Sequence, residues 1–210
     1  MKRFNKSNYH SFCDKAAEKD NDLKHIIKEY GYPPYWVRPN GFATIILTIL
    51  EQQVSLASAY AAYSKLREKL EVVSPESLLR LTDEQLRACY FSRQKIIYAR
   101  ELAHSIANGQ INLKKFFYQP DDVVRAELKK LKGIGDWTVD IYLIHALRRT
   151  DIFPVGDLAL VNAIKMVKGL NKVDREKIFA IGEQWKPYRS FATLLLWHYY
   201  IKKKNIKLLY

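Results

Sequence analysis

Cysteine is scarce in this sequence, with only Cys13 and Cys89 among 210 residues. Two thiols are too few for a disulfide framework, a cysteine-rich zinc site or an iron-sulfur cluster held by four cysteines. A chain of this length can bury a core large enough to fold without such crosslinks. We therefore expect a globular protein with no metal centre, in a reducing, intracellular environment.

Long hydrophobic runs are also missing. The longest apolar stretch, residues 42–50, is interrupted by threonines and is too short to cross a bilayer. The first ten residues, MKRFNKSNYH, carry positive charge without an apolar segment behind them, which is not the pattern of a secretory signal. We expect no membrane-spanning segment.

Positive charge is in excess. The 35 lysines and arginines outnumber the 22 aspartates and glutamates, which gives a formal net charge of +13, and the basic residues are spread along the whole chain. Such a charge predicts a polyanionic partner, with nucleic acid as the first candidate and an anionic membrane surface as the second. The alternative is a basic protein whose charge serves solubility alone.

Apolar residues recur with the helical period, and no long period-2 alternation bounded by hairpin turns is present, so the sequence predicts an all-α fold. Capping signals at Ser74 and Thr82 predict two short helices that begin at Pro75 and Asp83. The other expected helices span residues 14–30, 42–51, 55–70, 92–108, 121–131, 136–149, 158–168, 174–182 and 187–203. We expect two helical lobes with a cleft between them, one of residues 40–148 and one of residues 1–39 and 149–210.

The most distinctive stretch is Gly133-Ile134-Gly135, between two of these helices. Glycine allows positive φ and close backbone approach, which predicts a tight turn with Ile134 tucked between the helices. The amides that follow, together with the lysines of residues 129–132, would form an anion site. This is the helix-hairpin-helix pattern, which holds a DNA phosphate without reading sequence. The alternative is a plain αα-hairpin, and Asp136 opposes anion binding by its charge.

A resemblance to the helix-hairpin-helix superfamily of DNA glycosylases is carried by the segment LKGIGDWTVDIYLIHALRRTDIFPVGDLAL, in which a Gly/Pro-rich loop and Asp157 follow the hairpin. Three further stretches are similar to the 3-methyladenine DNA glycosylase II (AlkA) type: FATIILTILEQQVSLASA, FSRQKIIYARELA and WKPYRSFATLLLWHYY. The combination is more specific than any one piece. It implies the two-lobed HhH-GPD fold.

The resemblance implies an enzyme that extrudes a nucleotide from the duplex and breaks its N-glycosidic bond. Asp157 would be the catalytic residue, because a carboxylate stabilises the sugar cation that develops as the base leaves. Alternatively, Asp157 is only the N-cap of the helix at residues 158–168.

The implied DNA-binding residues lie in two places. Lys132, Gly133, Ile134, Gly135 and Thr138 belong to the hairpin, and Gln52 and Gln53 belong to a loop that follows an early helix. By resemblance, one of the two glutamines fills the gap left by the extruded base. The equal alternative is a polar loop that caps the next helix.

Trp137 bears on the mechanism. Members of the superfamily that also cleave the strand carry a lysine at this position, which forms a Schiff base with the sugar. Trp137 therefore implies a monofunctional enzyme, and its indole would hold a cationic methylated purine, the alternative being ordinary core packing. Tyr142 and Trp36 are the other expected base-pocket residues, with Phe12 and Trp197 as alternative candidates for the lining, because Ile141 and Leu158 replace aromatic residues frequent in the AlkA branch.

We therefore expect a monomeric base-excision repair enzyme that releases alkylated purines such as 3-methyladenine from double-stranded DNA. The rival predictions are a glycosylase for uracil or oxidised bases and a non-catalytic DNA-binding protein. No cofactor is expected beyond a monovalent cation, which the resemblance implies for the hairpin carbonyls. The expected location is the cytoplasm or nucleoid of a bacterium or the nucleus of a eukaryote, with no membrane partner.

Overall fold

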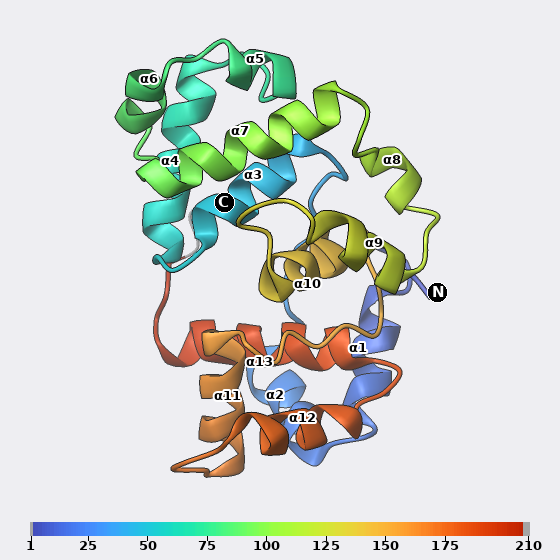
Figure 1. Cartoon of the computed structure of the whole chain (residues 1–210). Coiled ribbons are helices and arrows are strands. Elements are labelled where there is room, and N and C mark those ends of the chain that lie inside the picture. The colour runs from blue at the N-terminus through green and yellow to red at the C-terminus, as the bar shows by residue number, and fades with distance from the viewer. Residues whose placement is uncertain (1, 208–210) are drawn as a thin grey trace. The chain divides into compact units, whose positions relative to one another are not determined.

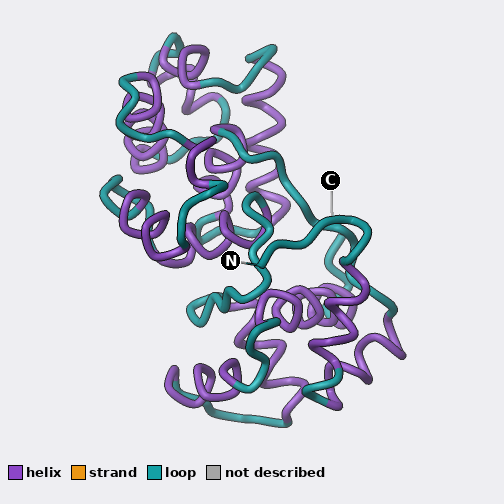
Figure 2. Tube along the Cα trace, turned by 90° about the vertical axis from the view of Figure 1, so that its right-hand side faces the viewer, coloured by secondary structure: helices purple, strands orange, loops and turns teal. Residues whose placement is uncertain are grey.

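The computed structural model of the chain describes residues 2–207, and this part is all-helical, as predicted (Figures 1 and 2). Its thirteen helices are α1 Tyr9–Ala17, α2 Asn21–Tyr30, α3 Phe42–Glu51, α4 Leu56–Lys69, α5 Pro75–Leu79, α6 Asp83–Ala88, α7 Arg93–Ala107, α8 Leu113–Phe116, α9 Asp121–Leu128, α10 Asp136–His145, α11 Leu158–Lys168, α12 Arg175–Glu183 and α13 Arg189–Lys203. No strand occurs among the described residues, and a single bridge joins Arg3 to Arg149.

One helix prediction near the start of the chain was wrong, and two helical segments were not predicted. The expected helix at residues 14–30 is two helices, α1 and α2, because Asp20 begins a new helix by accepting a hydrogen bond from the Asp22 N–H at 3.0 Å. The start of α1 at Tyr9 and the whole of α8 were not predicted. A four-residue helix is too short to show any apolar period.

Three helix ends also differ from the prediction. The helix expected to reach residue 131 ends at Leu128, and the next residues form turns with hydrogen bonds between residues three apart. The helix expected to reach residue 149 ends at His145. The latter stops because the Arg148 carbonyl accepts from the Phe4 N–H at 3.0 Å and Arg148 has a φ of 57°. The last helix begins at Arg189 instead of Pro187.

The chain divides into two compact units. The terminal unit comprises Met1–Val37 and Leu143–Lys207, and the central unit comprises Arg38–Tyr142. α10 crosses from one unit to the other.

In the central unit, α3 is the helix around which the others gather. Its sequence, FATIILTILE, is apolar on nearly every face, and eight of its ten residues are buried. It packs against α4 and α7, and α7 in turn packs against α5 and α6 (Figure 1). A helix that is apolar all round is stable only in such a position.

In the terminal unit, α13 has the corresponding role. Every residue from Ser190 to His198 is buried, and the helix packs against α1, α2 and α11 (Figure 1). At its start, the Arg189 guanidinium bonds to the Asp151 carboxylate at 2.8 Å, and the Ser190 hydroxyl accepts from the Ile152 N–H at 2.9 Å. Within the described range, none of the helices is long and apolar enough to traverse a bilayer.

Candidate functional site

The turn between α9 and α10 is tight, and its two glycines have different surroundings. Gly133 has a φ of +83°, in the region that glycine adopts without strain. A Cβ atom there would lie 2.2 Å from the Tyr98 ring, which packs directly on this residue. Ile134 is buried, as predicted, whereas Gly135 is exposed and an added Cβ would meet no atom within 4 Å. The fold of the chain therefore requires glycine at residue 133 but not at residue 135.

Side chains from α3 and α7 fasten this turn. The Gln52 amide, at the C-cap of α3, donates from Nε2 to the Gly133 carbonyl at 2.8 Å and to the Thr138 hydroxyl at 2.9 Å. The Glu101 carboxylate accepts from the Lys132 N–H at 2.8 Å. Since Thr138 is only 2% exposed, it and Gln52 belong to the frame of the turn in this state of the molecule.

Charges at the start of α10 are paired with cations of α9 and the turn. Asp136 accepts from Lys129 and from Arg125, each at 2.9 Å, and Arg125 also bonds to Asp140. The Lys129 ammonium and then the Arg125 guanidinium hold the pKa of Asp136 below its usual range. The negative charge that opposes anion binding in the sequence is thus compensated by two cations.

The three lysines beside the hairpin are not equivalent. Lys129 is held by Asp136, and Lys130 pairs with Glu127 at 2.7 Å. Lys132 is exposed, and within the described part of the chain its side chain forms no ion pair. All three line a shallow surface hollow of about 660 Å³ that the turn also borders. Lys132 is therefore the cation of this hollow most available to an anion.

The loop after α3 presents Gln53. This residue is exposed and has a φ of 56°, a conformation that side-chain-bearing residues seldom adopt outside functional or strained sites. The alternative in which the glutamines cap the next helix is wrong, because the Ser55 hydroxyl caps α4 by accepting from the Ser58 N–H at 3.1 Å.

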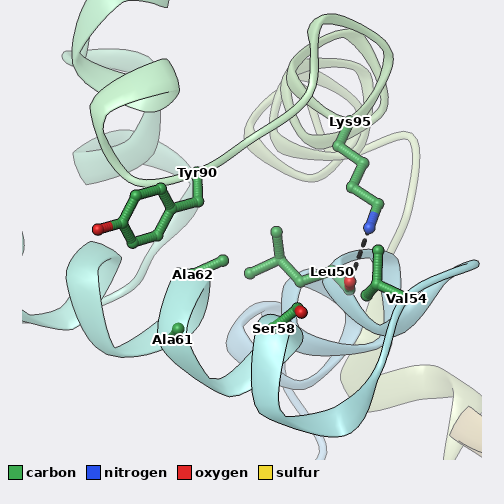
Figure 3. Close-up of a pocket in the computed structure, with 7 residues that line it drawn as sticks. All are labelled: Leu50, Val54, Ser58, Ala61, Ala62, Tyr90 and Lys95. Carbon is green, nitrogen blue, oxygen red and sulfur yellow. Dashed lines mark hydrogen bonds between the residues drawn. The ribbon is translucent and has the colours of Figure 1, made fainter.

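A pocket of about 250 Å³ lies beside this loop (Figure 3), lined by Leu50, Val54, Ser58, Ala61, Ala62, Tyr90 and Lys95. The Lys95 ammonium donates to the Leu50 carbonyl at 2.7 Å, and burial lowers the pKa of Lys95. Tyr90 is 64% exposed and has a φ of 62°. The sequence did not predict this pocket, because its walls come from separate segments that only tertiary packing brings together.

Asp157 stands at the N-cap of α11, in the terminal unit. One of its oxygens, Oδ1, accepts hydrogen bonds from the Leu160 N–H at 2.7 Å and from the Trp197 indole N–H at 2.9 Å. The residue is 9% exposed. The predicted N-cap is confirmed, and the indole contact was not foreseen, because Trp197 lies 40 residues further along the chain.

Aromatic and histidine rings continue from this carboxylate. The Trp197 indole stacks on His145, with ring centroids 5.6 Å apart and an interplanar angle of 11°. The half-buried Trp36 accepts a hydrogen bond at its carbonyl from His145 Nδ1, and its ring lies 6.2 Å from that of His198. Burial lowers the pKa of His198. The two histidines therefore serve the packing of the terminal unit.

The remaining base-pocket candidates lie on α10, in the central unit. Trp137 is half-buried in the first turn of the helix. Tyr142 is fully buried, and its hydroxyl donates to the Asn40 side-chain carbonyl at 2.5 Å. The predicted site residues thus form two groups, one around the hairpin in the central unit and one around Asp157 and Trp36 in the terminal unit. Over the residues described, no three His, Cys, Asp or Glu side chains are grouped as metal ligands would be.

The sequence is similar to proteins of one family. Residues 46–187, more than half of the chain and including the hairpin and Asp157, match the family described as HhH-GPD superfamily base excision DNA repair protein. A Bacillus subtilis protein named putative DNA-3-methyladenine glycosylase YfjP is 30% identical over 184 residues, which cover 83% of this chain. The chain spans only 64% of the length of that relative.

Two proteins of Schizosaccharomyces pombe match over more of their own length. The alkylbase DNA glycosidase-like protein mag2 is 29% identical over 198 residues, which cover 87% of this chain and 92% of mag2. The structure of the 3-methyladenine DNA glycosylase Mag1 in complex with abasic DNA matches with a TM-score of 0.83 at 25% identity, covering 89% of this chain and 95% of Mag1. The helical fold of this chain is therefore similar to that of Mag1.

Proposed function

Because the chain belongs to the HhH-GPD superfamily of base excision DNA repair proteins, we propose that it is a monofunctional DNA glycosylase that releases alkylated purines, such as 3-methyladenine, from double-stranded DNA. The observation that carries this proposal is Asp157, an acidic side chain held at the N-cap of α11 after the hairpin. The substrate class is supported by relatives named for 3-methyladenine and alkylated bases.

Binding begins at the hairpin. The backbone amides of Gly133 and Gly135 and the ammonium of Lys132 hold a phosphate of the damaged strand, since these three residues border the surface hollow, whereas the Ile134 N–H already donates to the Leu131 carbonyl at 3.2 Å. Gly135 supports this role, because the fold leaves its face open and a phosphate can approach its backbone closely. A monovalent cation at the hairpin carbonyls stays a prediction.

Extrusion of the nucleotide leaves a gap in the base stack. We assign the gap-filling role to Gln53, because Gln52 is already bonded to Gly133 and Thr138 whereas Gln53 is exposed at the tip of its loop. The positive φ of Gln53 points its side chain in a direction different from that in a regular helix or strand.

Departure of the base is the chemical step. As the N-glycosidic bond breaks, positive charge develops on the sugar, and the carboxylate of Asp157 stabilises it electrostatically while water attacks. An alkylated purine already carries positive charge, so it leaves without a dedicated general acid. The indole of Trp137 binds this cationic ring by stacking, and Trp137 cannot form the Schiff base that strand cleavage requires.

The test compares base release from methylated duplex DNA by the wild-type protein and by Asp157→Asn under single-turnover conditions. The asparagine oxygen can still accept from the Leu160 N–H, so the helix cap is kept while the charge is lost. We expect the rate to fall by about 100-fold or more, as for the loss of a group that stabilises charge in the transition state.

Asp174→Asn is the matched control, because Asp174 caps α12 in the same way, accepting from the Lys177 N–H at 2.7 Å. Its rate should equal that of the wild type. Equal release by all three proteins would remove Asp157 from the mechanism. A panel of single-lesion duplexes tests the substrate class. Release of uracil or oxidised bases instead of methylated purines would contradict the proposed substrate class, and binding without release of any base would indicate a non-catalytic DNA-binding protein.

A further inference from the structure

The contact between Trp197 and Asp157 goes beyond what helix capping requires. Asp174 caps α12 with the backbone N–H of Lys177 as the donor, and Asp157 has the equivalent donor in Leu160. The Trp197 indole adds a second donor to the same oxygen of Asp157, at 2.9 Å, from a different helix. Trp197 lies on α13, beyond the range of residues 46–187 that matches the family.

We propose that Trp197 is a positioning residue that fixes the orientation of the Asp157 carboxylate for glycosidic bond cleavage. This inference rests on the proposed function. The Leu160 N–H restrains Oδ1 of Asp157 from α11, and the Trp197 indole N–H adds a second restraint on the same oxygen from α13. A transition-state contact loses strength steeply when the charged group is displaced, so a fixed carboxylate is the more effective one.

The indole is itself held rigidly, which is what a positioning residue needs. Trp197 is 8% exposed, and a buried indole N–H has to find an acceptor. The His145 ring stacks on the indole, and the His145 Nδ1 is fixed by the carbonyl of Trp36. The orientation of Trp197 is therefore restrained by stacking on its ring face as well as by the hydrogen bond at its edge.

α13 also fixes the start of the loop that ends at Asp157. Arg189 bonds to Asp151 at 2.8 Å, and Ser190 accepts from the Ile152 N–H at 2.9 Å. Seven residues further along the same helix, Trp197 bonds to Asp157. The loop from Asp151 to Asp157 is thus attached at both ends to one buried helix, and the Trp197 bond is the attachment that acts on the carboxylate itself.

The test is Trp197→Phe, which removes the N–H donor and keeps an aromatic ring on His145. We expect the single-turnover rate of base release from methylated duplex DNA to fall about tenfold, the size expected for one hydrogen bond to a charged group. The Kd for a duplex containing an abasic-site analogue should stay within about twofold, because the contact orients a reacting group and does not bind DNA.

Trp185→Phe is the matched control. The Trp185 indole donates to Asp20, the N-cap of α2, also at 2.9 Å, so the same kind of bond is lost in the same unit away from the reacting carboxylate. Its rate should match that of the wild type. If Trp197→Phe fails to fold, a variant with β-(3-benzothienyl)alanine at residue 197 takes its place. This amino acid has sulfur where the indole has N–H and keeps the shape of the two fused rings.

The outcomes separate the two proposals. The positioning role is overturned if the residue 197 variants release base as fast as Trp185→Phe. It is also overturned if their loss of rate is matched by an equal loss of affinity for the abasic-site duplex. A wild-type protein that releases no base from any lesion overturns the proposed function itself. A slower rate with unchanged affinity, confined to residue 197, supports both.

Discussion

Three aspartates of the terminal unit cap helices by accepting a hydrogen bond from a backbone N–H, which lies two residues ahead of Asp20 and three residues ahead of Asp157 and Asp174. The rest of their surroundings differ. Burial by itself raises the pKa of Asp20, but hydrogen bonds from Lys168 and Trp185 outweigh it, so that its pKa lies below the usual range. Its charge is thus neutralised by Lys168, 2.7 Å away. Asp174 is exposed. Asp157 is buried at its cap, and one of its oxygens accepts both the Leu160 N–H and the Trp197 indole N–H.

At the same scale, Gln52 and Gln53 offer a sharp prediction because neighbouring, identical side chains have different environments. Gln52→Ala should lower the free energy of unfolding by roughly 1–3 kcal/mol, since the Gly133 carbonyl and the Thr138 hydroxyl both lose their donor. Gln53→Ala should change it by no more than about 0.5 kcal/mol, because the side chain is exposed. Urea unfolding followed by circular dichroism measures both.

The activity readout should show the reverse order. Gln53→Ala should slow base release from duplex DNA about tenfold while release from single-stranded DNA stays unchanged, because only the duplex has a gap to fill. If Gln53→Ala leaves the duplex rate unchanged, or slows both substrates equally, Gln53 does not fill the gap.

The different surroundings of these glutamines could not be predicted from sequence. Both are polar residues of one loop, and the partner that holds Gln52 lies 81 residues further along the chain. The same limit applied to Trp197 and Asp157. By contrast, the N-cap role of Asp157 was predictable, because the cap and its donor are three residues apart.

Among the elements, the hairpin is assembled by contacts from outside its own two helices. Tyr98 packs on Gly133, and the Gln52 side chain donates to the Gly133 carbonyl. The Glu101 carboxylate accepts from the N–H of the preceding residue, Lys132. The turn is therefore formed before any DNA binds, and the amides do not have to be ordered at the moment of binding. Preorganisation of this kind lowers the entropic cost of association.

Substituting the two glycines in turn separates the fold of this element from its contact with DNA. Gly133→Ala should cost about 2–5 kcal/mol of stability, since alanine adopts positive φ poorly and its Cβ would displace the Tyr98 ring. Gly135→Ala should cost less than about 1 kcal/mol, because its Cβ meets no protein atom. The Gly135 variant should nonetheless bind duplex DNA about tenfold more weakly, as the Cβ obstructs a phosphate at the amides.

Thermal unfolding and fluorescence-anisotropy titration would provide the two readings. Unchanged DNA affinity in Gly135→Ala would place the phosphate elsewhere, and an unchanged melting temperature in Gly133→Ala would contradict the packing of Tyr98.

Local signals account for most of the helix starts. Ser74 is the predicted N-cap of α5, Thr82 forms the predicted capping box of α6, and Ser92 caps α7. What the sequence could not supply are the ends set by tertiary pairing. The end of α10 depends on the backbone of Phe4, far from it in the chain.

At the level of the whole molecule, the net charge of +13 favours a polyanion such as the proposed DNA substrate but does not say where it would bind. Much of the positive charge is compensated locally, as for Lys129, Lys130 and Arg125 beside the hairpin. We therefore expect an unpaired cation beside the turn amides to contribute more to the free energy of phosphate binding than a lysine elsewhere on the surface.

Lys132→Ala and Lys24→Ala lower the net charge equally, so a comparison of the two distinguishes a local phosphate contact from the general field. Lys24 is an exposed residue of α2 in the terminal unit, and Lys132 borders the hairpin hollow. Each phosphate contact contributes about 0.9 to the slope of log K against log salt concentration. Lys132→Ala should therefore reduce the magnitude of the slope by about one, and Lys24→Ala should leave the slope unchanged. Anisotropy titrations between about 50 and 200 mM salt measure the slope, because DNA affinity changes by orders of magnitude over this range. Equal slopes for the two variants would mean that the hairpin holds DNA through its amides alone, with lysine charge acting only at a distance.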